Sequence, residues 1–162
     1  MLIELLSDKI QFLEEAGDWK EAIKKSAQPL LADGSIEESY IDAMIQMCQK
    51  YNAYIVLADR FAMPHASSEN GVNKMGVTLS IIKKPVDFFG KPVQILLTLA
   101  SNDSQSHLSL LQEVANVLGN PFIIEQLISA KSIADVSNII KKFELSEKDA
   151  IKKQECGKIT EF

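Results

Sequence analysis

The chain contains only two histidines, His65 and His107, and the setting of each favours chemistry at an imidazole nitrogen. Pro64 fixes its own φ and restricts the backbone of Met63, so the approach to His65 is stiff. Ser67, two residues later, is short and carries a hydroxyl that can donate a hydrogen bond. These residues predict an imidazole at the surface, in a defined orientation, with a small polar neighbour.

His107 stands four residues after Asp103, which with Asn102 is a candidate helix cap. The first turn of a helix has unpaired backbone N–H groups and the positive end of the helix dipole, and both favour an anion. A neutral imidazole at this position can donate a hydrogen bond to a negative group. Ser106 adds a hydroxyl at the same place.

Phosphoryl transfer through histidine is the chemistry that uses these residue types. A neutral imidazole nitrogen is a nucleophile for a phosphoryl group, and the transferred oxygens need hydrogen-bond donors. Ser67, Ser106 and Arg60, the only arginine, are candidate phosphate-binding residues, with a plain surface role as the alternative for Arg60. The chain has no nucleotide-binding motif, so the phosphoryl group must arrive on another donor.

Two other readings of the histidines remain open. A metal hydrolase would combine His65 and His107 with a carboxylate such as Asp59 or Asp103, but the sequence has no HxH or HxxxH spacing, and no metal or other cofactor is predicted. A plain binding scaffold would use neither histidine chemically and would accept no phosphoryl group.

The elements that must position these residues follow from hydrophobic periodicity. Asp18 is a predicted N-cap for a helix that ends before Gly34, and Ser35 with Glu38 predicts a capping box for the next helix. Pro121 predicts the first turn of a later helix. The predicted strands cover 53–58, 76–82 and 93–100, with a turn region at 83–92, and the predicted helices cover 18–33, 35–52, 102–118, 121–130 and 132–143.

This order of elements predicts an α/β sandwich with a small mixed β-sheet flanked by helices. His65 follows one predicted strand and His107 follows another. If these strands are neighbours, both rings meet at one edge of the sheet, which is where open α/β sheets bind ligands.

Composition limits the partners and the surroundings. A chain of 162 residues with net charge −5 predicts one domain, assigned to 1–143 with a polar tail at 144–162, and no nucleic-acid partner. Cys48 and Cys156 are far apart and form no metal spacing, which is typical of a cytoplasmic protein. Acidic residues interrupt the first apolar stripe, and no apolar run approaches a membrane span, so neither a signal peptide nor a transmembrane helix is predicted.

Three stretches of the sequence resemble a known family. The stretches "WKEAIKKSAQPLLADGSIEESYIDAM", "FAMPHA" and "HLSLLQEVANVL" are similar, in this order, to the enzyme IIA components of the bacterial phosphoenolpyruvate-dependent sugar phosphotransferase system, of the mannitol/fructose type. The Ala62–His65 core, Gly71-Val72, Lys74 and the Lys83–Pro85 turn look most like the ascorbate-type branch.

The resemblance implies the same sandwich fold and a phosphotransferase activity. It implies that His65 accepts a phosphoryl group from the phosphocarrier protein HPr and passes it to a cysteine of a IIB component, for ascorbate uptake. His107 would stabilise the phosphoryl group, and the membrane IIC carrier would be reached only indirectly. Mannitol, fructose or galactitol, or a regulatory module whose phosphorylation another protein reads, remain alternatives.

Two features of the resemblance bear on the partners. Phe61, Met63 and Met75 are candidates for an apolar partner face around His65, with core packing as the alternative for each. Ala66 stands where many members of the family have glycine, and Ser67 and Arg60 also depart from the common residues at their positions. These departures affect the loop and the choice of partner more than the role of His65.

Overall fold

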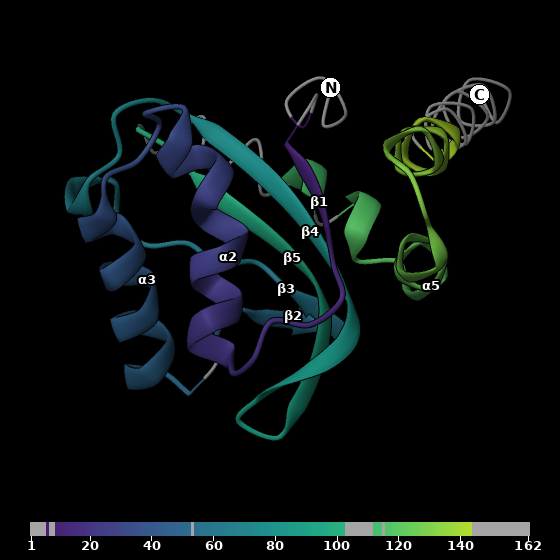
Figure 1. Cartoon of the computed structure of the whole chain (residues 1–162), viewed down its shortest axis with the longest axis horizontal. Coiled ribbons are helices and arrows are strands. Elements are labelled where there is room, and N and C mark those ends of the chain that lie inside the picture. Colours follow the sequence, from purple (N-terminus) through teal and green to yellow (C-terminus); the bar gives the residue numbers. More distant parts are fainter. Residues whose placement is uncertain (1–5, 7–8, 53, 103–111, 115, 144–162) are drawn as a thin grey trace, which may run out of the picture.

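The computed structural model describes residues 6, 9–52, 54–102, 112–114 and 116–143, and at its centre is one five-stranded mixed sheet (Figure 1). The strands are β1 (Ile10–Leu13), β2 (Val56–Ala58), β3 (Arg60–Ala62), β4 (Gly76–Phe88) and β5 (Lys91–Ala100). The helices are α2 (Trp19–Ala32), α3 (Glu38–Lys50) and α5 (Pro121–Ser129), with further helical residues at 112–114, 116–118 and 133–143 and a 3-10 turn η1 at Ser68–Asn70. The predicted α/β sandwich with a small mixed sheet is confirmed.

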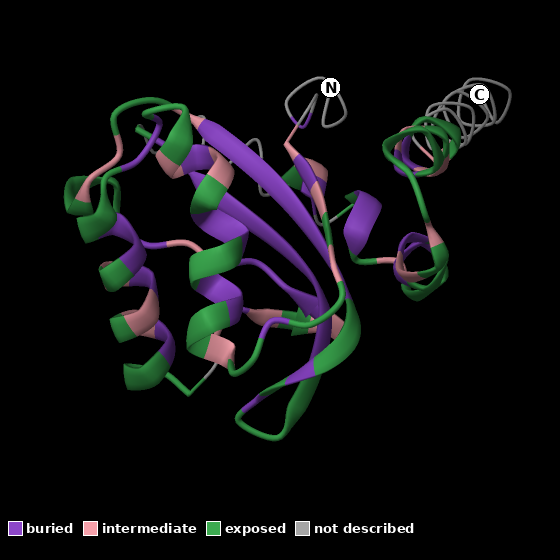
Figure 2. Ribbon diagram, viewed as in Figure 1, coloured by how far each residue is buried: buried purple, intermediate pink, exposed green. Residues whose placement is uncertain are grey.

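The sheet has the order β1-β4-β5-β3-β2 and separates two apolar cores. β4 and β5 pair antiparallel as a long hairpin, whereas β1 runs parallel to β4 and β3 runs parallel to β5. Helices α2 and α3 cover one face, and α5 with the helix at 133–143 lies on the other (Figure 1). The central strands are therefore buried on both faces over 76–82 of β4 and 93–100 of β5, whereas the end of their hairpin is largely exposed, as Figure 2 shows.

Helix α2 begins and ends where the sequence predicts. The carboxylate of Asp18 accepts a hydrogen bond from the Glu21 N–H at 2.9 Å, which satisfies one of the free donors of the first turn. Ala22, Ile23, Ser26, Ala27 and Leu30 form its buried stripe. Gly34, which follows the C-cap residue Asp33, has φ +81°, a left-handed conformation that glycine adopts without strain.

The predicted capping box of the second helix is wrong. Helix α3 starts at Glu38, and the side chain of Glu37, at the N-cap position, forms no capping bond. Ser35 is fully buried, and its N–H donates to the carbonyl of Leu30 and to the carboxylate of Asp33. The chain therefore needs Ser35 to close the end of α2 rather than to start α3.

The predicted turn region at 83–92 is also wrong in extent, because β4 continues through it to Phe88. Pro85 lies at an irregularity in the pairing of β4 with β5, between Ile81 and Val86, where a strand tolerates the loss of an N–H donor. The side-chain amide of Gln94 donates to the carbonyls of Ile82 and Lys83 at this irregularity and replaces ladder bonds.

Strands β1 and β3 are additions to the predicted sheet, and each is only three or four residues long. Within the ranges given above, no helix combines the length and the apolar character needed to cross a bilayer.

Candidate functional site

His65 lies just beyond the end of β3, and hydrogen bonds hold the backbone before it on two sides. The Met63 N–H donates to the Ile55 carbonyl at 2.8 Å, and the Leu99 N–H donates to the Pro64 carbonyl at 3.0 Å. β3 and β5 are parallel neighbours, so their ends meet at one edge of the sheet. The predicted strand at 53–58 is β2, which is not a neighbour of β5, and it is the unpredicted strand β3, inserted between them, that brings the end before His65 next to the end of β5.

The imidazole of His65 is half-buried and oriented by two contacts. Its Nδ1 lies 2.8 Å from the carbonyl oxygen of Met63. A carbonyl oxygen only accepts hydrogen bonds, so in the neutral ring the proton is on Nδ1 and the lone pair is on Nε2. The ring of Tyr54 meets the imidazole edge to face, with centroids 5.2 Å apart and an interplanar angle of 67°.

Two tyrosine hydroxyls hold the backbone at His65 and Ala66. The Tyr54 hydroxyl donates to the His65 carbonyl, and the Tyr40 hydroxyl accepts from the Ala66 N–H at 3.0 Å. Burial raises the pKa of Tyr40 to about 12, although the hydrogen bond with Ala66 opposes the shift, and burial also raises the pKa of Tyr54. Both hydroxyls therefore keep their protons at neutral pH.

The loop after His65 is bound to the connection between α2 and α3. The Glu37 N–H donates to the Gly71 carbonyl at 2.8 Å, and the Ser39 hydroxyl donates to the Asn70 carbonyl at 2.9 Å. The side-chain amide of Asn73 donates to Glu37 at 3.0 Å. Ser67 is exposed at the start of η1, two residues after His65, so its hydroxyl is accessible on this fixed loop.

The second half of the predicted site lies outside the described residues. His107, Ser106 and Asp103 all fall within 103–111, so the structure does not place them. The described chain on this side ends with β5 at Ala100, buried Ser101 and exposed Asn102.

Arg60, predicted as a phosphate-binding candidate, lies at the start of β3, whereas His65 follows its end. Arg60 pairs with Val93, and Pro64 is bonded to Leu99. Arg60 and Pro64 are four residues apart along the chain, which an extended backbone spans in at most ~14 Å. The guanidinium instead lies within ion-pair distance of Glu125 at 3.4 Å and of Asp59 at 3.6 Å. The guanidinium of Arg60 is therefore engaged with these carboxylates at the start of β3.

The predicted partner face needs correction. Phe61 and Met63 are each only 1% exposed and belong to the core between the sheet and α5. Neither side chain can touch a partner without leaving the core, because their positions on and after β3 point into the sandwich. Met75 is partly buried and packs against the same core. Core packing, the alternative from the sequence, is what Phe61 and Met63 do, whereas the partly buried Met75 stays a candidate for the partner face.

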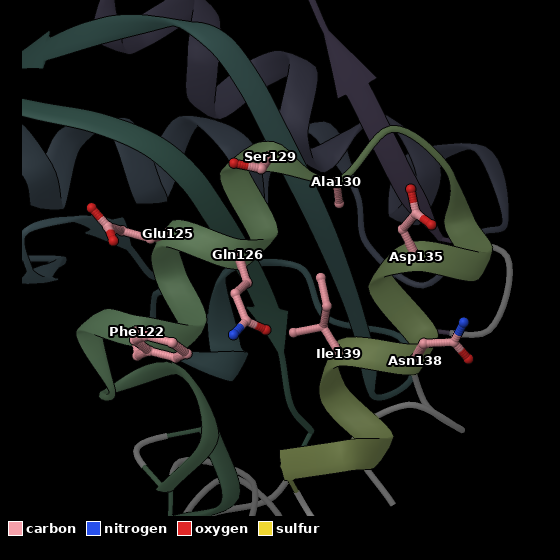
Figure 3. Close-up of a pocket in the computed structure, with 8 residues that line it drawn as sticks. All are labelled: Phe122, Glu125, Gln126, Ser129, Ala130, Asp135, Asn138 and Ile139. Carbon is pink, nitrogen blue, oxygen red and sulfur yellow. The ribbon is translucent and has the colours of Figure 1, made fainter.

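A separate groove of about 530 Å³ lies between α5 and the helix at 133–143 (Figure 3). Its lining includes the carboxylates of Glu125 and Asp135 and the amides of Gln126 and Asn138, but not His65. Within the described part of the chain, no cluster of three or more His, Cys, Asp or Glu side chains is arranged to hold a metal ion.

Tyr40 and Tyr54 contact the site although the sequence did not indicate them as functional. Tyr40 fell on the buried stripe of a predicted helix, where an aromatic residue needs no further explanation. Tyr54 fell within an apolar strand pattern at 53–58. The only available signal was the hydroxyl on each ring, since a buried tyrosine usually finds a hydrogen-bond partner.

Comparisons with known proteins agree with this fold. The model of the family described as "Phosphoenolpyruvate-dependent sugar phosphotransferase system, EIIA 2" matches residues 4–143. The mannitol-specific cryptic phosphotransferase enzyme IIA component of Escherichia coli K12 is 35% identical over 135 residues, which cover 82% of this chain and 92% of that protein. The ascorbate-specific EIIA component of Salmonella choleraesuis is 30% identical over 138 residues, covering 83% and 90%.

A solved structure gives the same result at the level of the backbone. The solution structure of the mannitol-specific cryptic enzyme IIA from Escherichia coli superposes with a TM-score of 0.80 at 33% identity, covering 88% of this chain and 99% of that one. The relatives thus carry names of two different sugar specificities.

Proposed function

Because this chain belongs to the EIIA 2 family of the phosphoenolpyruvate-dependent sugar phosphotransferase system, we propose that His65 is the residue that carries its phosphoryl group. As a member of this family, the chain is a IIA phosphotransferase component that relays phosphoryl groups in sugar uptake. The proposal adds the residues, the donor and the acceptor. The proposed IIA domain covers 1–143, and 144–162 is assigned as a polar tail that lies outside the described residues.

The hydrogen bond between Nδ1 of His65 and the Met63 carbonyl is the observation that carries the proposal. It leaves the lone pair on Nε2, which makes Nε2 the nucleophile. In the first transfer, this lone pair forms a bond to the phosphorus carried by HPr, while the bond from phosphorus to the donor breaks and its electron pair stays with the donor. In the second transfer, the thiolate of a IIB cysteine attacks the phosphorus, and the electron pair of the broken bond returns to Nε2.

The Met63 carbonyl also supports the phosphorylated state. When Nε2 carries the phosphoryl group and Nδ1 keeps its proton, the imidazole ring gains positive charge. The carbonyl oxygen 2.8 Å from Nδ1 bears partial negative charge and stabilises that ring. It does so without movement, because the Met63 N–H is itself bonded to Ile55.

Hydrogen-bond donors for the phosphoryl oxygens complete the proposed site. Ser67 is exposed on the loop two residues after His65, in a position to donate its hydroxyl. His107 and Ser106 are proposed as further donors on the strength of the family resemblance. Arg60 is left out, because β3 separates it from His65 and two carboxylates surround it.

The proposed partner face is the exposed loop at Ser67–Asn70 beside His65, in place of the buried apolar residues. Glu69 puts a carboxylate on this loop, and the whole chain carries a net charge of −5. A donor with a basic face around its phosphoryl group would be steered toward this acidic protein. Such contacts must form and break in each transfer, so a small interface suits them.

Ascorbate is the sugar proposed from the Ala62–His65 and Lys83–Pro85 motifs. The relatives are named for mannitol at 35% identity and for ascorbate at 30% identity, and these two values are too close to favour either sugar. The carrier that touches the sugar is another component, so this chain selects only its protein partners. Mannitol is therefore the alternative that the assay must include.

The test is a transfer assay with labelled phosphoenolpyruvate, enzyme I and HPr. Wild type, His65→Ala and His107→Ala are compared, and ascorbate-type and mannitol-type IIB proteins are then offered to the labelled protein. We expect acid-labile label on wild type, none on His65→Ala, and residual label on His107→Ala. Label that persists in His65→Ala, or no label on wild type, would refute the assignment of His65. The IIB protein that removes the label faster identifies the uptake system.

A further inference from the structure

The peptide group between His65 and Ala66 is hydrogen-bonded at both of its ends by tyrosine hydroxyls. Its carbonyl oxygen, which belongs to His65, accepts a hydrogen bond from Tyr54. Its N–H, which belongs to Ala66, donates to the hydroxyl of Tyr40 at 3.0 Å. Tyr40 lies in α3 and Tyr54 lies just before β2, so two separate parts of the fold meet on this one peptide.

We propose that Tyr40 and Tyr54 are positioning residues for phosphoryl transfer, and that together they clamp the peptide after His65 so that Nε2 points at the incoming phosphorus. This inference rests on the proposed role of His65. Neither tyrosine is assigned a covalent step. Their function is to restrict rotation of the chain at the nucleophile, because the rate of transfer depends on how closely the reacting atoms are aligned.

The clamp acts because rotation of a peptide group moves its N–H and its carbonyl in opposite directions. With both ends bonded, a change in ψ of His65 or in φ of Ala66 must break at least one of the two bonds. The preceding peptide is fixed too, since the Pro64 carbonyl accepts from the Leu99 N–H at 3.0 Å. The backbone on both sides of the imidazole is therefore held in place.

Tyr54 restrains the side chain as well as the backbone of His65. Its ring lies at 67° to the imidazole with centroids 5.2 Å apart, while its hydroxyl is bonded to the His65 carbonyl. The hydroxyl bond therefore fixes the ring that limits rotation of the imidazole. The bond from Nδ1 to the Met63 carbonyl then selects which nitrogen carries the lone pair.

Tyr40 ties the clamp to the centre of the sheet. Its side chain is only 1% exposed, and its hydroxyl donates to the Leu99 carbonyl at 2.7 Å while it accepts from Ala66. Leu99 lies in β5, which is buried on both faces. Because burial raises the pKa of both hydroxyls, each keeps its proton throughout the physiological range, and the clamp does not loosen with pH.

The test uses the full chain with Tyr54→Phe, which removes one hydroxyl and keeps the ring. Tyr51→Phe is the matched control, since Tyr51 is 52% exposed and its ring contacts that of Tyr54 with centroids 6.1 Å apart. Steady-state phosphorylation by phosphorylated HPr gives kcat and KM for each. Imidazole 15N chemical shifts of His65 give the tautomer populations in the unphosphorylated protein.

We expect Tyr54→Phe to lower kcat roughly fivefold with KM for HPr unchanged, which corresponds to the loss of one ordinary hydrogen bond. We expect the fraction of His65 with the lone pair on Nε2 to fall in the same variant. Tyr51→Phe should match wild type in both readouts. If Tyr54→Phe matches Tyr51→Phe in kcat and in the 15N shifts, the inference is overturned.

Tyr40→Phe and the double variant Tyr40→Phe/Tyr54→Phe complete a mutant cycle. Because the two hydroxyls hold two ends of one peptide, release of either end frees it, and the double variant should lose less kcat than the product of the two single losses. Multiplicative losses would show that the tyrosines act separately and would refute the clamp. The thermal midpoint of each variant confirms that the measured chain is folded, and the Tyr54→Phe comparison stands even if Tyr40→Phe does not fold.

The 15N shifts separate this inference from the proposed function, because they are measured without any phosphoryl transfer. If wild type takes no label but Tyr54→Phe alters the His65 tautomers, the clamp exists and the proposed function fails. If wild type takes label on His65 and both readouts of Tyr54→Phe are unchanged, the proposed function stands and the clamp fails.

Discussion

Nδ1 of His65 lies 2.8 Å from the carbonyl oxygen of Met63, two residues earlier in the chain. Under the proposed role of His65, this pair directs the phosphoryl group to Nε2, because the carbonyl must receive the Nδ1 proton. We predict that 15N-edited and 31P spectra of the phosphorylated protein show phosphorus coupled to Nε2 alone, at neutral pH. A phosphoryl group on Nδ1 would show that the bond to Met63 breaks before transfer.

Arg60 combines a left-handed backbone, φ +66°, with ion pairs to the exposed carboxylates of Asp59 and Glu125. Exposed ion pairs contribute little stability, ~0.5 kcal/mol, whereas glycine would relieve the backbone strain by ~1 kcal/mol. We predict that Arg60→Gly unfolds at the same urea concentration as wild type or at a higher one, and that Arg60→Ala, which keeps the strain, is less stable than Arg60→Gly.

The same two variants test the place of Arg60 in the chemistry. Because β3 separates Arg60 from His65, both variants should accept phosphoryl groups from HPr at the wild-type rate within twofold. A tenfold loss of kcat in both would mean that Arg60 reaches the phosphoryl group after all, against its position at the start of the strand.

Periodicity predicted the elements that bury a stripe or a continuous apolar run. Helix α2 and strand β5 form where the hydrophobic pattern of the sequence predicts them, because packing against the core requires apolar residues at regular positions along each element. β3 could not be predicted, since its three residues give no period and its place depends on partner residues in β5 that lie 33 or 34 positions later in the chain. The strand predicted at 76–82 ends just before Lys83, because Pro85 indicates a turn. In the structure the side-chain amide of Gln94 donates hydrogen bonds to backbone carbonyls at the irregularity, so β4 continues past Pro85.

The site was predictable only as far as short-range constraints extend. Pro64 and the small residues after His65 indicate a stiff imidazole at the surface; in the structure its backbone is held by hydrogen bonds and its ring is half-buried. The contacts to Tyr40 and Tyr54 depend on tertiary packing of α3 and of the segment before β2, so no local pattern contains them. The prediction of an apolar partner face was wrong for Phe61 for a related reason. The sequence near a histidine does not indicate whether an apolar side chain packs into the core or faces solvent, and Phe61 packs into the core.

The carboxylate of Asp33 binds Lys9 at 2.5 Å and accepts from the Ser35 N–H at 2.9 Å, where α2 ends. Burial alone would raise the pKa of Asp33, but the hydrogen bonds from Lys9 and Ser35 outweigh it and lower the pKa from 3.8 to about 2. A carboxyl with a lowered folded-state pKa contributes stability above its unfolded pKa, and this contribution is lost as the pH falls from about 4 to about 2.

We therefore predict that Asp33→Asn reduces the free energy of unfolding by about 1 kcal/mol at pH 6, less than the pKa shift alone implies because solvent screens this exposed carboxylate, and by progressively less toward pH 2. Urea unfolding of wild type and Asp33→Asn at pH 6, 4 and 2.5 measures the difference in their free energies of unfolding. The other carboxyl groups titrate equally in both proteins, so their contributions cancel in this difference. A difference that stays constant down to pH 2.5 would show that the charge of Asp33 does not stabilise the fold.

Gly71 occupies a place in the loop after His65 that no side chain fits. Its φ is +122°, and a Cβ atom there would lie 2.5 Å from the Ser39 Oγ and 3.3 Å from the Tyr40 nitrogen. We predict that Gly71→Ala lowers the free energy of unfolding by ~3 kcal/mol, from strain plus overpacking. Gly34→Ala is the control, since Gly34 has φ +81° with nothing within 4 Å of its Cβ position, and should cost only ~1 kcal/mol.

Gly71→Ala should also slow phosphoryl transfer, whereas Gly34→Ala should not. The new methyl group displaces the start of α3, where Ser39 holds the Asn70 carbonyl and Tyr40 holds the Ala66 N–H, so the strain reaches the loop of His65. Urea unfolding and kcat with phosphorylated HPr, measured on both variants at a temperature where both are folded, check the prediction. Equal losses of stability in the two variants would mean that the positive φ of each glycine alone determines the cost of the substitution. The loop at Gly71 would then be able to move away from Ser39.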